Sequence, residues 1–180
     1  MVTSNNFVQK IGESKERPSD PRNREIVRPA FNDPFRGNFE TPVNASDFSR
    51  IFINNLPAYR RGLSAQRRGL EVGMAHGYWL LGPFAVFGPL RNTDVAYLAA
   101  LLATIGLIVI STIAISLYAT VHQPPSQPIV TTPGVPDTYK TQEGWNEYAS
   151  GFLVGGIGGA IFAYALLNFV VGRDFFGYFS

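Results

Sequence analysis

The sequence predicts an all-α membrane protein with three transmembrane helices and an extended polar N-terminal arm. Its charges are unevenly distributed: residues 1–68 contain 12 of the 15 Lys and Arg residues, and the other 112 residues contain three. Long apolar and glycine-rich stretches fill the second part, which is typical of membrane helices. Five prolines between positions 18 and 42 oppose a long helix in the first part. We therefore expect an arm at 1–50 and a transmembrane domain at 51–180.

The first span is expected at about 69–87, within a helix that begins after Ser64. Serine is a favourable N-cap because its hydroxyl accepts a hydrogen bond from the first turn. No residue between Val72 and Leu90 is charged apart from His76 when it is protonated. Residues 51–63, just before this helix, are expected to form a short interfacial segment.

The second and third spans are expected at about 95–121 and 145–171. The second is a run of 27 residues without a charge, which is long enough to cross a bilayer with some tilt. In the third, small residues recur every four positions, and this stripe would let another backbone approach closely. The stripe consists of Gly151, Gly155, Gly159 and Ala163.

Orientation follows from the positive charges that flank the first span. Four arginines precede it, at positions 60, 61, 67 and 68, whereas the short loop after it contains Arg91 alone. Positive charge is retained on the cytoplasmic side, so we expect a cytoplasmic or stromal N-terminus and a lumenal or periplasmic C-terminus. The N-terminal residues lack the apolar region of a secretory signal, and acids lie among their arginines, so we expect the mature chain to begin here.

Two ionisable residues in the first span, Glu71 and His76, are the candidate functional residues. An ionisable side chain at membrane depth is costly and is a functional-site hypothesis by default. Five helical steps place the two residues roughly 140° apart, so they would face different neighbours. A carboxylate at position 71 could instead pair with Arg67 or Arg68, and the imidazole could make a hydrogen bond between helices.

A sharper interpretation of both residues is axial ligation of a tetrapyrrole metal. A neutral imidazole would supply one nitrogen at His76, and a carboxylate oxygen at Glu71 suits magnesium, so chlorophyll fits better than haem. Glycines at 69, 73 and 77 would leave room for a flat macrocycle, although they would serve helix packing equally well.

The sequence also argues against several classes of protein. It contains no cysteine, which excludes disulfides, thiolate catalysis and cysteine-ligated metal sites. It contains no phosphate-binding loop, nucleophile elbow or zinc spacing, so we expect no enzyme activity and no metal site held by the protein alone. The arginines flank a membrane span and lack a nucleic-acid pattern, so no nucleic-acid partner is expected. The alternative function is a small transporter or channel component that uses Glu71 and His76 as a proton relay.

Two sequence runs closely resemble the family of photosystem I subunit XI (PsaL). They are residues 55–64 (NLPAYRRGLS) and 68–78 (RGLEVGMAHGY). Shorter matches lie at 32–35, 41–42, 82–83, 88–91, 94–95, 143–145 and 151–152, so the resemblance covers about residues 30–175.

The resemblance implies a three-helix, non-catalytic photosystem I subunit in a thylakoid or cell inner membrane. It further implies binding of antenna chlorophyll a and of β-carotene or a related carotenoid, with Glu71 and His76 at the positions of chlorophyll ligands. The implied partners are the photosystem I core, small membrane subunits, lipid, and copies of the same subunit at the centre of a trimer. The glycine stripe of the third span would then pack against neighbouring subunits.

Overall fold

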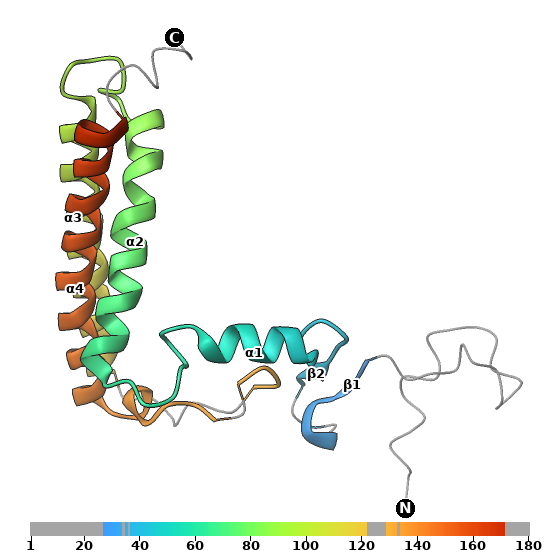
Figure 1. Cartoon of the computed structure of the whole chain (residues 1–180). Helices are drawn as coiled ribbons and strands as arrows, with labels where there is room; N and C mark the ends of the chain where they lie inside the picture. Colours follow the sequence, from blue (N-terminus) through green and yellow to red (C-terminus); the bar gives the residue numbers. More distant parts are fainter. Residues whose placement is uncertain (1–26, 34, 36, 122–128, 133, 172–180) are drawn as a thin grey trace, which may run out of the picture. The chain divides into compact units, whose positions relative to one another are not determined.

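The computed structural model describes residues 27–33, 35, 37–121, 129–132 and 134–171. These residues belong to two compact units. One unit comprises residues 1–59 and 127–135, and the other comprises 60–126 and 136–180. The first contains short elements, and the second contains the long helices (Figure 1).

The first unit opens with a small antiparallel pair of strands, which was not predicted from the sequence. Strand β1 (Arg28–Pro29) pairs with β2 (Phe39–Glu40), and η3 (Ala30–Asn32) lies between them in the chain. An ion pair of 3.3 Å between Arg28 Nε and Glu40 Oε2 crosses the pair. The described part of the expected arm is therefore locally ordered.

Helix α1 (Asp47–Asn55) completes this part of the chain. Its N-cap is Ser46, whose hydroxyl accepts a hydrogen bond from the Ser49 amide. Phe48, Ile51 and Phe52 recur at helical spacing on one face and are exposed. The segment after the second long helix belongs to the same unit, since Asn54 Nδ2 donates to the Thr131 carbonyl at 2.7 Å.

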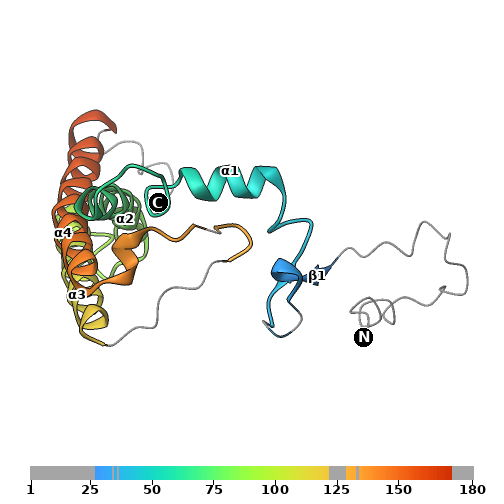
Figure 2. The same cartoon turned by 90° about the horizontal axis from the view of Figure 1, so that it is seen from below.

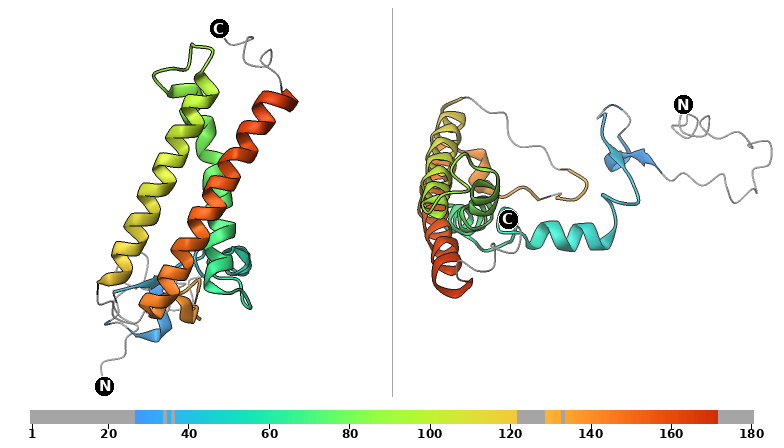
Figure 3. Two further views of the ribbon diagram at one scale, coloured as in Figure 1. Left: turned by 90° about the vertical axis from the view of Figure 1, so that its left-hand side faces the viewer. Right: turned by 90° about the horizontal axis from the view of Figure 1, so that it is seen from above.

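The second unit is a bundle of three long helices, which lie side by side in Figures 1, 2 and 3. They are α2 (Ala65–Phe87), α3 (Ala96–Thr120) and α4 (Gln142–Ala165). A 3-10 turn, η4 (Asp137–Lys140), precedes α4, and a π-helical segment, η5 (Leu166–Val171), continues it. The predicted helices agree with these bounds to within a few residues. The last one starts earlier than expected because Thr141 caps it and accepts from the Gly144 amide.

Two of these helices, α3 and the continuous helix Gln142–Phe169, are long and apolar enough to cross a membrane. Helix α2 does not meet the same criterion, although it is 23 residues long. The physical reason is its composition, since Glu71, His76 and several glycines lower its hydropathy. A third crossing by α2 therefore stays a prediction.

The most extensive helix contact joins α2 to α4, and glycines from both helices form it. A Cβ atom on Gly69, Gly73 or Gly77 would collide with the backbone of α4. In return, a Cβ on any of the α4 glycines at 151, 155 and 159 would collide with the backbone of α2. Two small-residue stripes thus face one another, which is how membrane helices come close enough to pack well.

This contact corrects two expectations. The α4 stripe at Gly151, Gly155 and Gly159 does not face neighbouring subunits, because α2 of the same chain already lies against it. The α2 glycines likewise contact α4, which confirms the helix-packing alternative for them and not an open bed for a macrocycle. Both stripes were visible in the sequence, but their spacing alone could not tell which helix each one meets.

Candidate functional site

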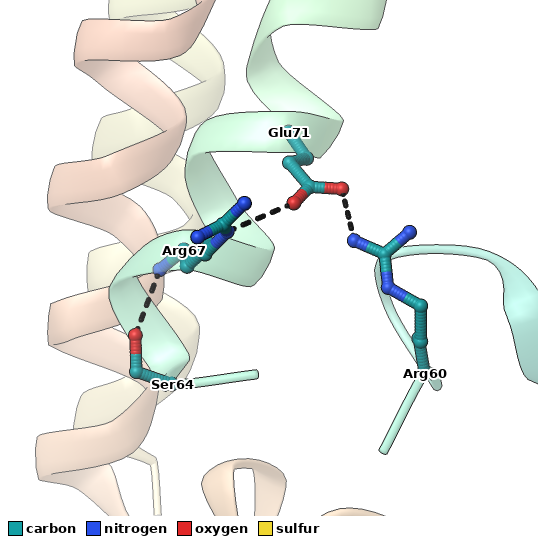
Figure 4. A network of polar contacts seen from close by, with 4 residues as sticks. All are labelled: Arg60, Ser64, Arg67 and Glu71. Atoms are coloured by element: carbon teal, nitrogen blue, oxygen red, sulfur yellow. Dashed lines mark hydrogen bonds and ion pairs between the residues drawn. The ribbon is translucent and has the colours of Figure 1, made fainter. Parts of the chain in front are cut away.

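Glu71 lies in the second turn of α2 and is held by two arginines (Figure 4). Its Oε1 lies 3.1 Å from Arg67 Nε, and its Oε2 lies 2.5 Å from Arg60 Nη2. The turn is ordered by Ser64, whose hydroxyl accepts from the Arg67 amide at 3.3 Å, as expected of an N-cap. The ion pair between Glu71 and Arg67 is therefore confirmed.

The second arginine of this network was not predicted from the sequence. Arg60 precedes Glu71 by 11 positions and belongs to the loop before α2, so helical spacing could not reveal it. The chain turns at Gly62, whose φ of 80° is unfavourable for other residues, and this turn accompanies the return of Arg60 toward the helix. In the sequence, the signal available for this contact was the pattern Arg-Arg-Gly at residues 60–62, just before the helix cap.

The two arginines balance the negative charge of the Glu71 carboxylate, but its oxygens can still accept further hydrogen bonds or a ligand. The side chain of Glu71 is 24% exposed, and each of its two oxygens is paired with one guanidinium group. A carboxylate offers about four lone-pair positions, so it can still accept a further ligand or donor. Glu71 thus suits a weak monodentate contact with a hard cation, and a strongly basic role is disfavoured by its two cationic neighbours.

His76 lies on another side of α2 and makes its hydrogen bond within the same helix. Its Nδ1 lies 2.8 Å from the carbonyl oxygen of Val72. A carbonyl can only accept, so Nδ1 must carry the proton, and in the neutral ring Nε2 is then the atom with a free lone pair. Among the described residues no hydrogen bond to Nε2 is formed, and the side chain is exposed. The alternative prediction, a hydrogen bond from His76 to another helix, is wrong, because this bond stays within α2.

The imidazole ring also contacts α4. It meets Phe152 edge to face, with 5.4 Å between ring centroids and 61° between planes. Phe152 is 4% exposed and packs with Ile108 and Tyr148 in the bundle core, so it is a rigid neighbour. The hydrogen bond and this contact together fix how the ring lies.

Glu71 and His76 do not form one site. Within the part of the chain that the structure describes, no hydrogen bond or ion pair joins them, and no group of three acidic or histidine side chains is placed to hold a metal ion. This agrees with their roughly 140° separation around the helix. The arrangement supports two separate single contacts rather than a paired acid–base centre.

The start of α4 carries an aromatic cluster, of which Trp145 and Tyr148 were predicted as an aromatic belt. Trp145 lies between Tyr118 and Tyr139, at centroid distances of 5.1 and 4.8 Å. Its Nε1 donates to the Tyr139 carbonyl at 3.2 Å. The other predicted belt, at residues 175–178, lies outside the described residues.

Comparison with known proteins places this architecture in a family. Residues 26–171 match the family described as Photosystem I reaction centre subunit XI. The chain belongs to this family. The subunit XI of Nostoc punctiforme is 61% identical over 163 residues, covering 90% of this chain and 94% of the relative. Those of Trichormus variabilis and Mastigocladus laminosus are 58% and 56% identical, with the same shares covered.

Membership in the subunit XI family identifies the complex and the membrane to which the chain belongs. It is a photosystem I subunit, and the photosynthetic membrane is its location. Its two strongly apolar helices agree with that location. The region that matches the family includes Glu71, His76 and both glycine stripes.

Proposed function

We propose that this photosystem I subunit is a non-catalytic membrane component that binds antenna chlorophyll and carotenoid and connects photosystem I complexes into oligomers. Helix α2 would be the third membrane crossing, beside α4. The N-terminus would then lie on the cytoplasmic or stromal side, and the C-terminus on the lumenal or periplasmic side. The membrane would be the thylakoid, or the cell inner membrane in a host without thylakoids.

The observation that carries the pigment-binding proposal is the state of His76. Its proton is on Nδ1, held by the Val72 carbonyl, so the lone pair on Nε2 is directed away from that bond. Hydrogen bonds of this kind, made by the ring nitrogen that does not bind the metal, fix the tautomer and the ring orientation of metal-binding histidines. The exposed position allows a macrocycle to approach from outside the chain. The residues present therefore fit axial coordination of the magnesium of one chlorophyll.

Glu71 is proposed as the second chlorophyll contact. Magnesium prefers oxygen ligands, and the carboxylate has lone pairs left beside its two ion pairs. The arginines make this ligand weaker than an isolated carboxylate, while they also lower the cost of placing a charge close to the membrane. The contact at Glu71 should accordingly tolerate more change than the one at His76.

The proton-relay alternative has less support. A relay needs groups that exchange protons along a connected path. Here Glu71 faces two permanently charged guanidinium groups, and His76 faces its own helix and Phe152. Family membership also favours the photosystem role.

For assembly, the proposed partners are the photosystem I core, its small membrane subunits, lipid, and copies of this chain at a trimer centre. The α2–α4 glycines are already in contact, so other surfaces must serve these partners. The outer face of α3 offers a candidate surface with exposed apolar side chains. They are Leu98, Leu102, Ile110, Ile113 and Leu117.

The experiment is a chlorophyll count on purified photosystem I from a strain with His76→Leu. We expect one chlorophyll fewer per copy of this subunit, because leucine supplies no lone pair but still favours the membrane. The matched control is Trp79→Leu, which also replaces an exposed ring on α2 with leucine. An unchanged count in His76→Leu would remove His76 from the ligands.

A further inference from the structure

A polar pocket of about 260 Å³ lies where α3 ends and α4 begins, at the same end of the helix bundle (Figure 3). Residues 119–121 at the end of α3 form one wall, and residues 139–142 with Trp145 form the other. Both helices are apolar enough to cross a membrane, so a pocket at their ends lies at the level of the lipid headgroups. Its volume is just below the roughly 300–1,000 Å³ of typical small-molecule pockets, so it suits a group of about one ring.

The two walls of this pocket offer opposite hydrogen-bonding groups. The last carbonyl groups of a helix have no amide partner within the helix, and the first amides have no carbonyl partner. The wall at 119–121 therefore offers acceptors and the negative end of the α3 dipole, whereas Thr141 and Gln142 bring donors and the positive end of the α4 dipole. A hydroxyl group both donates and accepts, so a ligand with several hydroxyl groups can satisfy both walls.

The side chains at the start of α4 keep further hydrogen-bonding capacity. The Thr141 hydroxyl accepts from the Gly144 amide, which leaves its own proton to donate. Lys140 Nζ lies 2.6 Å from Asp137 Oδ1 and carries two further protons. Gln142 is exposed beside them and has both a donor and an acceptor in its amide.

The charges around the pocket favour a neutral ligand. Asp137 already balances Lys140, and Glu143 follows in the first turn of α4, so a phosphate or carboxylate group would meet two carboxylates. A cationic group would meet Lys140 and the positive end of the α4 dipole. The hydrogen-bonding groups and the charges together describe an uncharged ligand that is rich in hydroxyl groups.

Trp145 gives the same pocket an apolar surface. Its single donor, Nε1, is used on the Tyr139 carbonyl at 3.2 Å, so the rest of the indole offers only its ring. Contacts with Tyr118 and Tyr139, at centroid distances of 5.1 and 4.8 Å, hold the indole in place. A sugar ring carries hydroxyl groups at its edge and C–H groups on its faces, so it matches both the polar walls and the indole.

An apolar path continues from the pocket along α3. Val121 lines the pocket, and Leu117 and Ile113 precede it at intervals of four residues, toward the middle of the helix. All three side chains are more than half exposed. An acyl chain joined to a group in the pocket can lie along them, whereas a free sugar gains nothing from this path.

We propose that this pocket binds the sugar headgroup of a neutral membrane glycolipid, whose ring packs on Trp145 and whose acyl chain runs along α3. The site specifies the lipid partner of the proposed function and rests on that function only for the presence of lipid beside α3. It uses neither Glu71 nor His76, so it holds or fails independently of pigment binding.

The test is Thr120→Phe in photosystem I purified from the living host, with glycolipids, phospholipids and chlorophyll counted per complex by mass spectrometry. Thr120 is exposed, and its hydroxyl donates to the Leu117 carbonyl of its own helix, so the new ring fills the pocket without breaking a contact between helices. We expect the loss of one monohexosyl lipid per copy of this chain, with the phospholipid and chlorophyll counts unchanged. The matched control is Thr93→Phe, because Thr93 is also exposed and bonds the carbonyl three residues earlier, but lies outside the pocket.

A second variant, Gln142→Leu, removes hydrogen bonds without filling the pocket. Losing one hydrogen bond to the headgroup should lower the occupancy of the glycolipid about fivefold after a detergent wash. Gln66→Leu is its control, since Gln66 is likewise an exposed glutamine in the first turn of a long helix. This pair decides the question if Thr120→Phe prevents assembly.

Several results would overturn the proposal. They are an unchanged glycolipid count in Thr120→Phe, the loss of a phospholipid in its place, and an equal glycolipid loss in Thr93→Phe. Release of a free sugar from the unaltered complex, with no glycolipid lost in the variant, would contradict the lipid source. Equal occupancy in Gln142→Leu and Gln66→Leu would contradict the assigned hydrogen bonds.

Discussion

The Nδ1 atom of His76 lies 2.8 Å from the carbonyl oxygen of Val72, one helical turn earlier. The bond assigns different tasks to the two ring nitrogens, since Nδ1 orients the ring and Nε2 keeps its lone pair. Substitutions that mimic one nitrogen at a time can therefore separate orientation from ligation.

His76→Gln and His76→Asn provide that separation. The glutamine amide reaches about as far as Nε2 and offers an oxygen to magnesium, whereas the shorter asparagine amide reaches only the region of Nδ1. We expect the chlorophyll to be retained at least in part with glutamine and to be lost with asparagine. Low-temperature absorption and a chlorophyll count on purified complexes measure this. Equal loss in both variants would show that ligand reach is not what matters at this position.

The Arg60–Glu71 pair should restrain the loop before α2. Glu71→Gln removes the charge that holds Arg60 and Arg67, and such partly exposed pairs contribute up to about 1 kcal/mol each. Losing 1 kcal/mol raises the open fraction of the loop about fivefold. Trypsin should then cut after Arg60 and Arg61 faster, by a similar factor, while chlorophyll is retained. Glu147→Gln, at an exposed position on α4, is the control and should leave the cleavage rate unchanged.

The glycine contact between α2 and α4 should not tolerate a side chain. Gly155→Leu would drive its side chain into the backbone at Leu70, and we expect a destabilisation of about 3 kcal/mol, at the upper end of the usual cost of overpacking. The subunit should be depleted from purified photosystem I, as measured by quantitative mass spectrometry. The same substitution at Gly106 meets open space and should leave the subunit content normal. Normal subunit content in both variants would mean that α2 and α4 can move apart to admit the leucine side chain without loss of stability.

Three crossings would place the two ends of the chain on opposite membrane faces. Epitope tags at the two ends, probed with impermeant antibodies on sealed vesicles of each orientation, measure this. We expect the N-terminal tag on the cytoplasmic or stromal side, because four arginines precede α2. Both tags on one side would limit the chain to two crossings, which would be α3 and α4.

Deletion of the whole subunit should convert oligomeric photosystem I to monomers while light-driven charge separation continues. The reason is that we assign the chain pigment and contact roles but no electron-transfer group. Sucrose-gradient sedimentation gives the oligomeric state, and flash absorption gives charge separation. Oligomers that persist after complete deletion would disprove the assembly role.

Several features were predictable because they depend on neighbours in sequence. The helix bounds follow from local signals, such as the Ser64 cap and the charge-free run of α3. The Arg67–Glu71 pair follows from helical spacing. These signals need no knowledge of which elements meet.

The features that could not be predicted depend on contacts between distant parts of the chain. Arg60 reaches Glu71 only through the turn at Gly62, and the α4 glycines meet α2 about 80 residues earlier in the sequence. A stripe of glycines predicts that another backbone packs closely against the helix, but it does not identify which helix that is. Helix α1 was not predicted although its local signals are present, since Ser46 is a favourable N-cap and Phe48, Ile51 and Phe52 recur at helical spacing.

The interlocked glycines also bear on how the chain is made. Gly69 finds its contacts on α4 at residues 148–152, so some 80 residues must be synthesised after Gly69 before its partner exists. At about 5–20 residues per second this is an interval of roughly 4–16 s. During it, the least apolar of the three long helices, with Glu71 and His76, would have only α3 beside it. During biogenesis, α2 therefore lacks its main packing partner for this interval, which ends when α4 inserts.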